Sequence, residues 1–480
     1  MQNYISSTKR VGWDNVEEIN KNWTTLLDKN KRRMGQTYSI YIGNLPQNER
    51  SEDPLQYKKD WKKKYDEFVK QHLAENQWSD PLSVQQALNA SNDEYTSYVR
   101  SNGKEGGYTY IYGKNICYNI QRHRYIFLVK SVPHYPFDSK TAFRYGWDFS
   151  SMKKPRSLTK AVWIEEESYI TQPFTIRHIY HFVESLNFLW LKLQYINDFP
   201  VMRRIWLPLY NPAYDYAWDN AYIQLLLTTF GEGYGLRVMD GPSMQRLVHN
   251  TTLPLICFRH VLLLDRSCYN GDGGSLSGWM SADLFRAAAY KYSNVTLSQP
   301  ERHHPYHFTF LQRSGYRRFV SPHFIQFLIK KHFGDQLDVS IHYTNGSFAE
   351  QVTLLANSDI VLSPHGAGQT NIVFMRPFTA FIEAYPPFFY EETFMNLANI
   401  VRIQYFSITT YNETYIPKGV GKGAGQQLYE QGKLLRRRRR FLRALIDPEP
   451  FNVLSVVDNA VEWLHSYRFK RSVYENHLLF

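Results

Sequence analysis

The chain has 480 residues, of which 43% are hydrophobic and 21% are charged, a balance that excludes an intrinsically disordered protein. The formal net charge of +12 favours an anionic partner, which leaves nucleic acid, a membrane surface or a nucleotide phosphate as options. Three cysteines exclude a disulfide framework and allow one bridge at most, while the length allows two or three domains.

Residues 1–105 are polar and rich in Lys, Asp and Asn, and they are expected to form a stem or a peripheral helical segment, with a charged helix over 53–77. No apolar run approaches the length of a membrane-spanning helix, and the first residues lack the basic and apolar parts of a signal peptide. Membrane attachment would therefore require a segment that is absent from this sequence.

Residues 106–303 are expected to form a first α/β domain. Aromatic and β-branched residues over 108–129 are typical of strands, and they precede a region in which apolar runs alternate with helical patterns. The expected helices cover 176–195, 221–230 and 281–290, the last with Ser281 as its N-cap, and the expected strands cover 203–209 and 255–264.

Residues 304–480 repeat this alternation and are expected to form a second domain. Strands are expected over 308–312, 337–343, 360–363 and 378–384, and helices over 321–331, 348–356, 391–400 and 453–467. This alternation predicts a doubly wound parallel sheet in each domain. A glycine-rich and then arginine-rich stretch, 417–443, is expected to be a mobile basic loop, with a site for an acidic partner or for processing as the alternative.

The segment Ser363–Asn371 has the composition of a phosphate-binding turn. It follows the apolar run 359–362 and precedes a short apolar run that could open a helix. Gly366 and Gly368 would let the backbone approach an anion, and the first N–H groups of the helix would face it. His365 could add a hydrogen bond or a positive charge. The alternative is an ordinary strand-to-helix turn.

Two further residues are expected near this turn. Arg313 follows the strand over 308–312, and ligands of open α/β sheets bind at the carboxyl ends of the strands. Glu383 lies in an otherwise apolar strand, so it needs a partner if it is buried. A pyrophosphate bound by Arg313 and a ribose bound by Glu383 would satisfy both; a surface cation and an ion pair are the alternatives.

Three ordered blocks resemble glycosyltransferase family 61: Thr309–Arg318, Asp359–Asn371 and Phe381–Tyr385. The resemblance implies a GT-B fold, with two Rossmann-like domains facing across a cleft. It also implies an inverting transfer of a sugar, such as N-acetylglucosamine, xylose or arabinose, from a UDP-sugar to a hydroxyl of a glycan or glycoprotein.

Carried over by position, the resemblance assigns Arg313 to the diphosphate and Glu383 to the nucleoside. It assigns the phosphates to His365, Gly366, Ala367, Gly368, Thr370 and Asn371. Gln369 departs from the family, which usually has Leu there, so the packing behind the turn is expected to differ.

The acceptor side is predicted from a looser match over 178–184. An inverting transferase needs a general base for the acceptor hydroxyl, and the candidates are Glu184, His181 and Asp219. Tyr180 stands where many family members have His. The alternative is a pair of helix residues that supports the structure.

No Asp-x-Asp motif is present for a metal-bound diphosphate, and the histidines within 302–307 are read as an interdomain linker; we therefore expect no obligatory metal or cofactor. Six Asn-x-Ser/Thr sites favour the lumen of the Golgi or endoplasmic reticulum.

Two other functions remain open. One is a catalytically degenerate GT-B protein that binds nucleotide or glycan. The other is a nucleic-acid-binding protein, which only the charge suggests and which is not our expectation.

Overall fold

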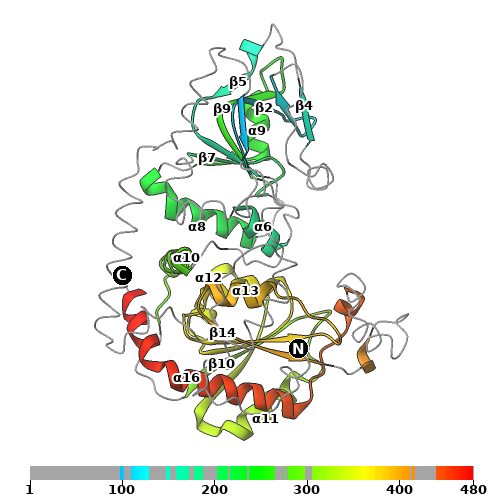
Figure 1. Ribbon diagram of the computed structural model, residues 1–480, viewed down its shortest axis with the longest axis vertical. Helices are drawn as coiled ribbons and strands as arrows, with labels where there is room; N and C mark the ends of the chain where they lie inside the picture. Colours follow the sequence, from blue (N-terminus) through cyan, green and yellow to red (C-terminus); the bar gives the residue numbers. More distant parts are fainter. Residues whose placement is uncertain are drawn as a thin grey trace. The chain divides into compact units, whose positions relative to one another are not determined.

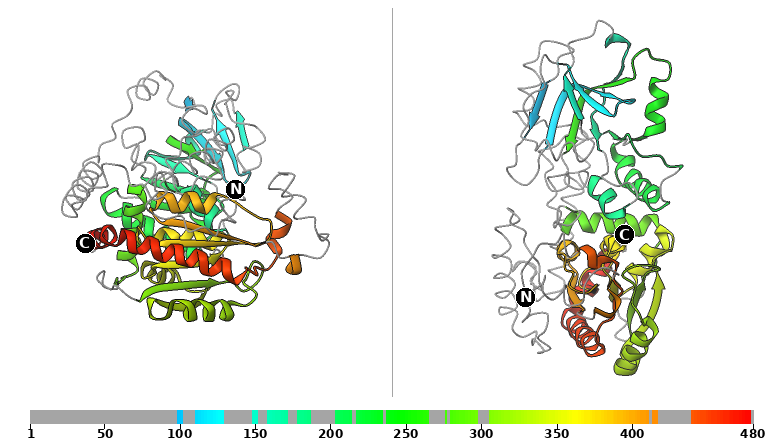
Figure 2. Two further views of the ribbon diagram at one scale, coloured as in Figure 1. Left: turned by 60° about the horizontal axis from the view of Figure 1, so that its bottom comes forward. Right: turned by 90° about the vertical axis from the view of Figure 1, so that its right-hand side faces the viewer.

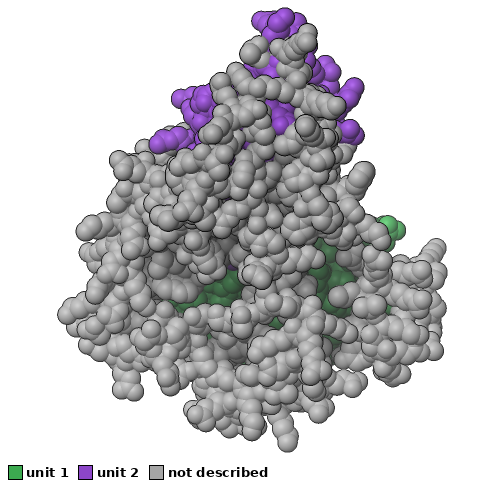
Figure 3. Space-filling view, turned by 45° about the horizontal axis from the view of Figure 1, so that its top comes forward, with its two compact units in different colours: residues 1–65, 272–274, 282–480 green, residues 66–271, 275–281 purple. Residues whose placement is uncertain are grey.

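The computed structural model describes residues 98–101, 110–128, 148–151, 158–171, 178–186, 203–213, 217–234, 237–264, 276, 279–297, 305–410, 413–416 and 439–478. The expected helix over 53–77 and the glycine-rich part of the loop over 417–443 lie outside them. The described residues form two compact units, drawn in two colours in Figure 3. One contains those from Ala282 onward, and the other contains those up to Leu264 together with 276 and 279–281. The bounds predicted for the three domains stay predictions.

The C-terminal unit is built on a five-stranded parallel sheet with the order β11-β10-β12-β13-β14. Its strands are β10 (Tyr306–Gln312), β11 (Leu337–Tyr343), β12 (Ile360–Pro364), β13 (Ala380–Tyr385) and β14 (Gln404–Thr409). In chain order this is 2-1-3-4-5, a doubly wound arrangement, so the parallel sheet expected here is confirmed. The fifth strand, β14, was not predicted.

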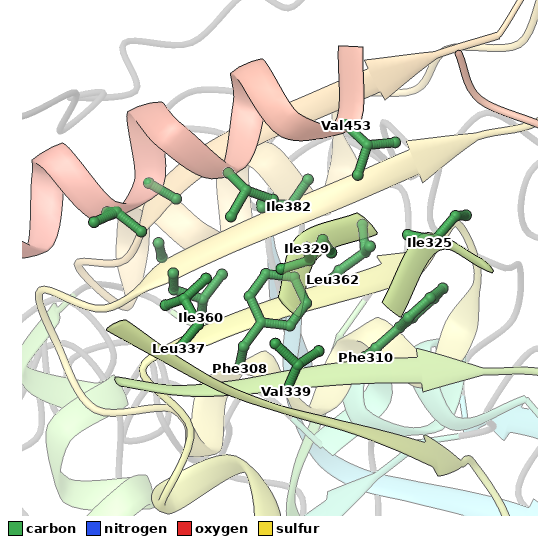
Figure 4. Close-up of a cluster of buried hydrophobic side chains, with 14 of the residues drawn as sticks. Phe308, Phe310, Ile325, Ile329, Leu337, Val339, Ile360, Leu362, Ile382 and Val453 are labelled. Atoms are coloured by element: carbon green, nitrogen blue, oxygen red, sulfur yellow. The ribbon is translucent and has the colours of Figure 1, made fainter. Parts of the chain in front are cut away.

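Helices cover both faces of this sheet (Figures 1 and 2). On one face lie α11 (Pro322–Phe333) and α16 (Pro450–Leu478), whose apolar residues join those of the strands in one buried cluster. Figure 4 shows Val453 of α16 and Ile329 of α11 within this cluster, together with Phe308 and Ile382 of the sheet. On the other face lie α12 (Phe348–Ala356), α13 (Thr393–Ile400) and the 3₁₀ helix η6 (Ala367–Phe374).

Local signals set several of these helix ends. Ser347 and Glu350 form a capping box at the start of α12, in which each side chain accepts a hydrogen bond from the other's backbone N–H. Pro322 occupies the first turn of α11, as expected, but the Ser321 side chain makes no capping hydrogen bond. The segment after the glycine turn is a 3₁₀ helix, not an α-helix.

The N-terminal unit contains a nine-stranded mixed sheet with the main order β4-β3-β2-β9-β6-β7-β8. Its strands are β1 (Tyr98–Ser101), β2 (Tyr110–Asn119), β3 (Arg124–Phe127), β4 (Asp148–Ser151), β5 (Val162–Ile164), β6 (Ser168–Ile170), β7 (Arg204–Leu207), β8 (Arg237–Asp240) and β9 (Leu255–Leu264). The strands from β9 to β8 are parallel, but β2 is antiparallel to β1, β3 and β9. The purely parallel sheet predicted for this region is therefore wrong.

A disulfide joins two central strands of this sheet. Cys117 of β2 and Cys257 of β9 are partners in the strand register and are bonded to each other. The one bridge that the cysteine count allowed is thus formed between residues 140 positions apart in the sequence.

The helices described between Ile179 and Tyr292 are α6 (Ile179–Leu186), α8 (Ala217–Tyr234), α9 (Gly241–Val248) and α10 (Trp279–Tyr292). Because α10 begins at Trp279, the prediction of Ser281 as its N-cap is wrong. Over the described part of the chain, no helix has the length and apolar character needed to span a membrane.

Candidate functional site

The predicted donor residues gather where the strand order of the C-terminal sheet reverses, between β10 and β12. Arg313 follows β10, and His365 follows β12, so both side chains start from the carboxyl edge of neighbouring strands. The Arg313 guanidinium lies against the Cα of Gly366: a β-carbon built on this glycine would lie 3.2 Å from Arg313 Cζ. Two blocks that are 50 residues apart in the sequence therefore meet at one point.

Arg313 opens a short turn, the arginine loop (Arg313–Phe319), which the buried Gln312 side chain closes. Gln312 Oε1 accepts hydrogen bonds from the backbone N–H of Arg313 at 3.1 Å and of Phe319 at 3.0 Å. Gln312 Nε2 donates to the Phe319 carbonyl at 3.1 Å. One side chain thus holds both ends of the loop together.

The other side of the arginine loop is bound by a segment more than 120 residues downstream. Arg317 N–H donates to the Ala444 carbonyl at 3.1 Å, and Ile446 N–H donates to the Arg318 carbonyl at 2.9 Å. Arg317 has a φ of 61°, a conformation that non-glycine residues adopt only when the surroundings enforce it. The hydrogen bonds on both sides account for this conformation.

Arg313 and Arg317 form a half-buried pair of like charges. Burial lowers the pKa of the Arg313 guanidinium, and burial followed by the charge of Arg313 lowers the pKa of Arg317 to about 10, while Glu391 acts in the opposite direction. In the described residues neither guanidinium makes a salt bridge, and the buried Arg317 Nε has no hydrogen-bond partner. A bound anion would neutralise both groups and supply the missing acceptor.

Gly366 has a backbone conformation that suits glycine alone. Its φ of 155° and ψ of 174° lie in a region that side chains exclude. The first bond of η6 runs from Gln369 N–H to the Gly366 carbonyl at 2.9 Å, so the N–H groups of Ala367 and Gly368 precede the helical ladder. A β-carbon on Gly368, by contrast, would meet nothing within 4 Å.

The predicted phosphate contacts Thr370 and Asn371 are buried and use polar groups to fix η6. Thr370 Oγ1 donates to the Ala367 carbonyl at 2.7 Å. Asn371 Nδ2 donates to Gln351 Oε1 at 2.6 Å, which ties η6 to α12. Gln369 is also buried and reaches back to the Ser363 carbonyl of β12. Any phosphate role for Thr370 and Asn371 stays a prediction.

Glu383 lies behind His365 and is fully buried. Its Oε1 lies 2.7 Å from His365 Nδ1, and its Oε2 accepts hydrogen bonds from Tyr385 at 2.8 Å and from Tyr405 at 2.7 Å. The other ring nitrogen, His365 Nε2, lies 3.5 Å from a carboxylate oxygen of Glu391. The nucleoside role predicted for Glu383 is untested, but its carboxylate already has three protein partners.

A buried charge cluster anchors the far end of η6. Arg286 of α10 donates to the Val373 carbonyl at 3.0 Å and to Asp283 at 2.8 Å. Asp283 also accepts a hydrogen bond from Arg402 at 2.6 Å. Because Arg286 reaches a carbonyl near the C-terminal end of η6, it places a cation where the helix dipole is negative.

The predicted catalytic bases lie on two helices of the N-terminal unit. His181 of α6 is half-buried and stacks on His178, with a ring separation of 4.4 Å. Asp219 in the first turn of α8 is fully buried. The backbone of Glu184 lies in α6, but its side chain lies outside the described part of the structure. Their catalytic roles stay predictions.

Three residues of this site were not predicted from the sequence: Arg317, Tyr385 and Tyr405. Two had a signal. Arg317 follows Arg313 by four residues across Gly315, and Tyr385 lies two residues after Glu383 in a strand, hence on the same face. Tyr405 comes from β14, which was not predicted.

The family model described as "Glycosyltransferase 61" matches residues 239–382, which include Arg313, His365 and the glycine turn. No curated protein matches the sequence.

Seventeen solved chains match. One is a 5,10-methylenetetrahydrofolate dehydrogenase from the silkworm, Bombyx mori, with 12% identity over 61% of this chain and 97% of that one. Its TM-score of 0.16 carries no argument about fold or function. The family match spans the residues that build the arginine loop and the glycine turn, and over residues 239–382 the chain is similar to glycosyltransferase family 61.

Proposed function

We propose that this protein transfers a sugar from a UDP-sugar to a hydroxyl of a glycan or glycoprotein, with inversion at the anomeric carbon. The observation that carries the proposal is the pair of half-buried arginines, Arg313 and Arg317, beside the Gly366 turn. Two adjacent cations without a salt bridge in the described residues fit the two phosphates of a nucleoside diphosphate.

In the proposed reaction, the acceptor oxygen loses its proton to a base and attacks the anomeric carbon. The bond between this carbon and the β-phosphate oxygen breaks, and UDP leaves with the electron pair. Negative charge grows on the diphosphate as the bond breaks. Arg313, Arg317, His365 and the N–H groups of Ala367 and Gly368 would stabilise it, a contribution that otherwise falls to a metal ion.

The base would come from His181, Glu184 or Asp219. The same proposal includes the GT-B arrangement and a reaction that needs no metal or cofactor. It also includes a donor sugar that is N-acetylglucosamine, xylose or arabinose. Nucleic acid is not among the proposed partners.

We further propose that the protein works in the lumen of the Golgi or endoplasmic reticulum. The Cys117–Cys257 bridge supports an oxidising compartment. Three Asn-x-Ser/Thr asparagines within the described residues, Asn250, Asn294 and Asn345, are exposed to solvent, as glycan attachment requires. Attachment to a membrane through a segment outside this sequence remains compatible with that location.

The proposal is tested by UDP binding and by UDP-sugar turnover. UDP should raise the unfolding temperature, and Arg313→Ala or Arg317→Ala should weaken UDP binding about 10- to 100-fold in calorimetry, the loss expected for hydrogen bonds to a charged group. Arg318→Ala is the matched control, because this side chain is exposed and the hydrogen bond to the downstream segment uses the backbone carbonyl, which the substitution keeps.

UDP binding that survives both Arg313→Ala and Arg317→Ala at full strength would contradict the proposal. Arginine-dependent binding without transfer or hydrolysis of any UDP-sugar would instead support the degenerate binding protein.

A further inference from the structure

The carboxylate of Glu383 is enclosed by hydrogen-bond donors. His365 Nδ1 approaches one oxygen, and the hydroxyls of Tyr385 and Tyr405 approach the other. The two hydroxyls also lie 2.9 Å from each other, and Tyr385 Oη lies 2.5 Å from the Glu391 carbonyl. All four side chains are at least nine-tenths buried. The cluster therefore has little room for competing water.

The positions of the protons follow from the chemistry of these groups. An ionised carboxylate only accepts hydrogen bonds. Burial, and next the charge of Glu383, raises the pKa of both Tyr385 and Tyr405 well above the ordinary value, so both hydroxyls remain donors. With Glu383 ionised, the 2.7 Å contact between Oε1 and His365 Nδ1 requires a proton on Nδ1. The remaining nitrogen, Nε2, is then the one that faces away from the cluster.

The surroundings of Nε2 link His365 to the arginine pair. Nε2 lies 3.5 Å from a carboxylate oxygen of Glu391, and the charge of Glu391 also acts on Arg317. His365 directly precedes Gly366, whose Cα lies beside the Arg313 guanidinium. The ring is further held by aromatic contacts, with centroids 5.4 Å from Tyr385 and 4.9 Å from Phe389.

We propose that Glu383, Tyr385 and Tyr405 are positioning residues that hold the His365 ring by its Nδ1–H, so that Nε2, when it carries a proton, donates a hydrogen bond to the departing diphosphate. This inference rests on the proposed transferase function and specifies how its histidine is oriented. It also gives Glu383 a role other than nucleoside binding, since this fully buried carboxylate already has three protein partners.

Tyr405→Phe is the sharpest variant, because it removes one donor to Glu383 and leaves the ring. Tyr390→Phe is the matched control: Tyr390 lies in the same aromatic cluster, 5.3 Å from the Tyr385 ring, but its hydroxyl contacts the sulfur of Met395. Glu383→Gln removes the negative charge with little change in volume. Without this charge beside it, His365 is no longer required to carry a proton on Nδ1.

The first measurement is NMR of protein carrying ¹⁵N-labelled histidine without ligand, with the His365 signals assigned by their loss in His365→Asn. We expect an Nδ1–H proton signal in the wild type, a shift of that signal in Tyr405→Phe, and its loss or transfer to Nε2 in Glu383→Gln. Tyr390→Phe should leave the His365 signals in place.

The second measurement is steady-state kinetics with the UDP-sugar donor. Tyr405→Phe should lower kcat about fivefold to tenfold, the effect of one hydrogen bond to a charged group, with the donor KM changed less than about threefold. If Tyr405 had only a structural role, Tyr405→Phe would lower the amount of folded enzyme. The His365 signals of the folded fraction would then be unchanged.

Two results would overturn the inference. One is a Tyr405→Phe variant with unchanged His365 signals and unchanged kcat. The other is a Glu383→Gln variant with normal kcat but lost discrimination between UDP and other nucleoside diphosphates, which would return Glu383 to the nucleoside. Failure of the proposed function would look different: the wild type would neither bind UDP nor turn over a UDP-sugar, while the NMR of the free protein would still report on the cluster.

Discussion

The guanidinium of Arg313 occupies the space in which any side chain at position 366 would begin. Arg313 and Gly366 come from the ends of two adjacent parallel strands, and the missing β-carbon lets the arginine lie against the backbone of the glycine turn. The glycine is thus required both by its positive φ and by the space that its neighbour fills.

Gly366→Ala should therefore impair donor binding. The new methyl group would push the Arg313 guanidinium aside, and the backbone conformation would cost a further ~1–3 kcal/mol. We expect at least about tenfold weaker UDP binding in calorimetry. Gly368→Ala is the comparison variant, since its β-carbon would meet nothing within 4 Å in the free protein, and it should weaken UDP binding less than Gly366→Ala does. Equal behaviour of the two variants would contradict this picture of the turn.

UDP affinity should fall as the pH rises through about 10. Burial and the neighbouring Arg313 lower the pKa of Arg317 to about 10, so in the free protein Arg317 loses its charge around this pH. A bound diphosphate favours the charged form and raises this pKa, so binding takes up a proton near pH 10. Between pH 7 and 9 Arg317 contributes no pH dependence.

The measurement is calorimetry from pH 7 to 10.5 at constant ionic strength, with circular dichroism to confirm that the protein stays folded. Arg317→Gln should bind more weakly throughout and lose most of the decline near pH 10. A wild-type affinity that stays constant through pH 10.5 would contradict the assignment of Arg317 to the diphosphate.

Asp283→Asn should destabilise the C-terminal unit by about 3–5 kcal/mol. Asp283 accepts from both Arg286 and Arg402, and all three side chains are buried, so removal of the negative charge leaves two buried cations without their shared partner. Urea unfolding measures the change. Asp335→Asn makes the same substitution at an exposed position of this unit and should stay within about 0.5 kcal/mol of the wild type.

Removal of the Cys117–Cys257 bridge should lower the free energy of unfolding by about 2–4 kcal/mol, because the bridge closes a long loop in the unfolded chain. Thermal unfolding of the wild type should shift downward with reductant, whereas the double variant Cys117→Ala/Cys257→Ala should not respond. A wild type that is indifferent to reductant would argue against the bridge and would weaken the proposed luminal location.

The sequence predicted the C-terminal sheet well because each strand there is a short apolar run between two helical patterns. The expected strands over 308–312, 337–343 and 360–363 agree with β10, β11 and β12 within two residues. The N-terminal sheet was harder, because the direction in which two strands pair is not encoded in their periodicity. Nothing local in 110–119 shows that β2 runs antiparallel to β9.

The arrangement of the proposed donor site was predictable for those residues that directly follow a strand. Arg313, His365 and Gly366 each follow a strand, and parallel strands bring their ends to one edge. The partners of Glu383 were not predictable in the same way. Tyr405 reaches this carboxylate from another strand, 22 residues away, and only the packing of β13 against β14 brings the two together.

The hydrogen bonds from the arginine loop to Ala444 and Ile446 make the last part of the chain a component of the proposed donor site. The same stretch continues into α16, which contributes side chains as far as Leu464 to the core beneath the sheet. A fragment that ends at residue 382, where the family match ends, would contain Arg313, Arg317 and Gly366. It would still lack the downstream segment whose hydrogen bonds hold the arginine loop. A premature stop codon between residues 383 and 464 is therefore expected to abolish activity, although Arg313 is still present.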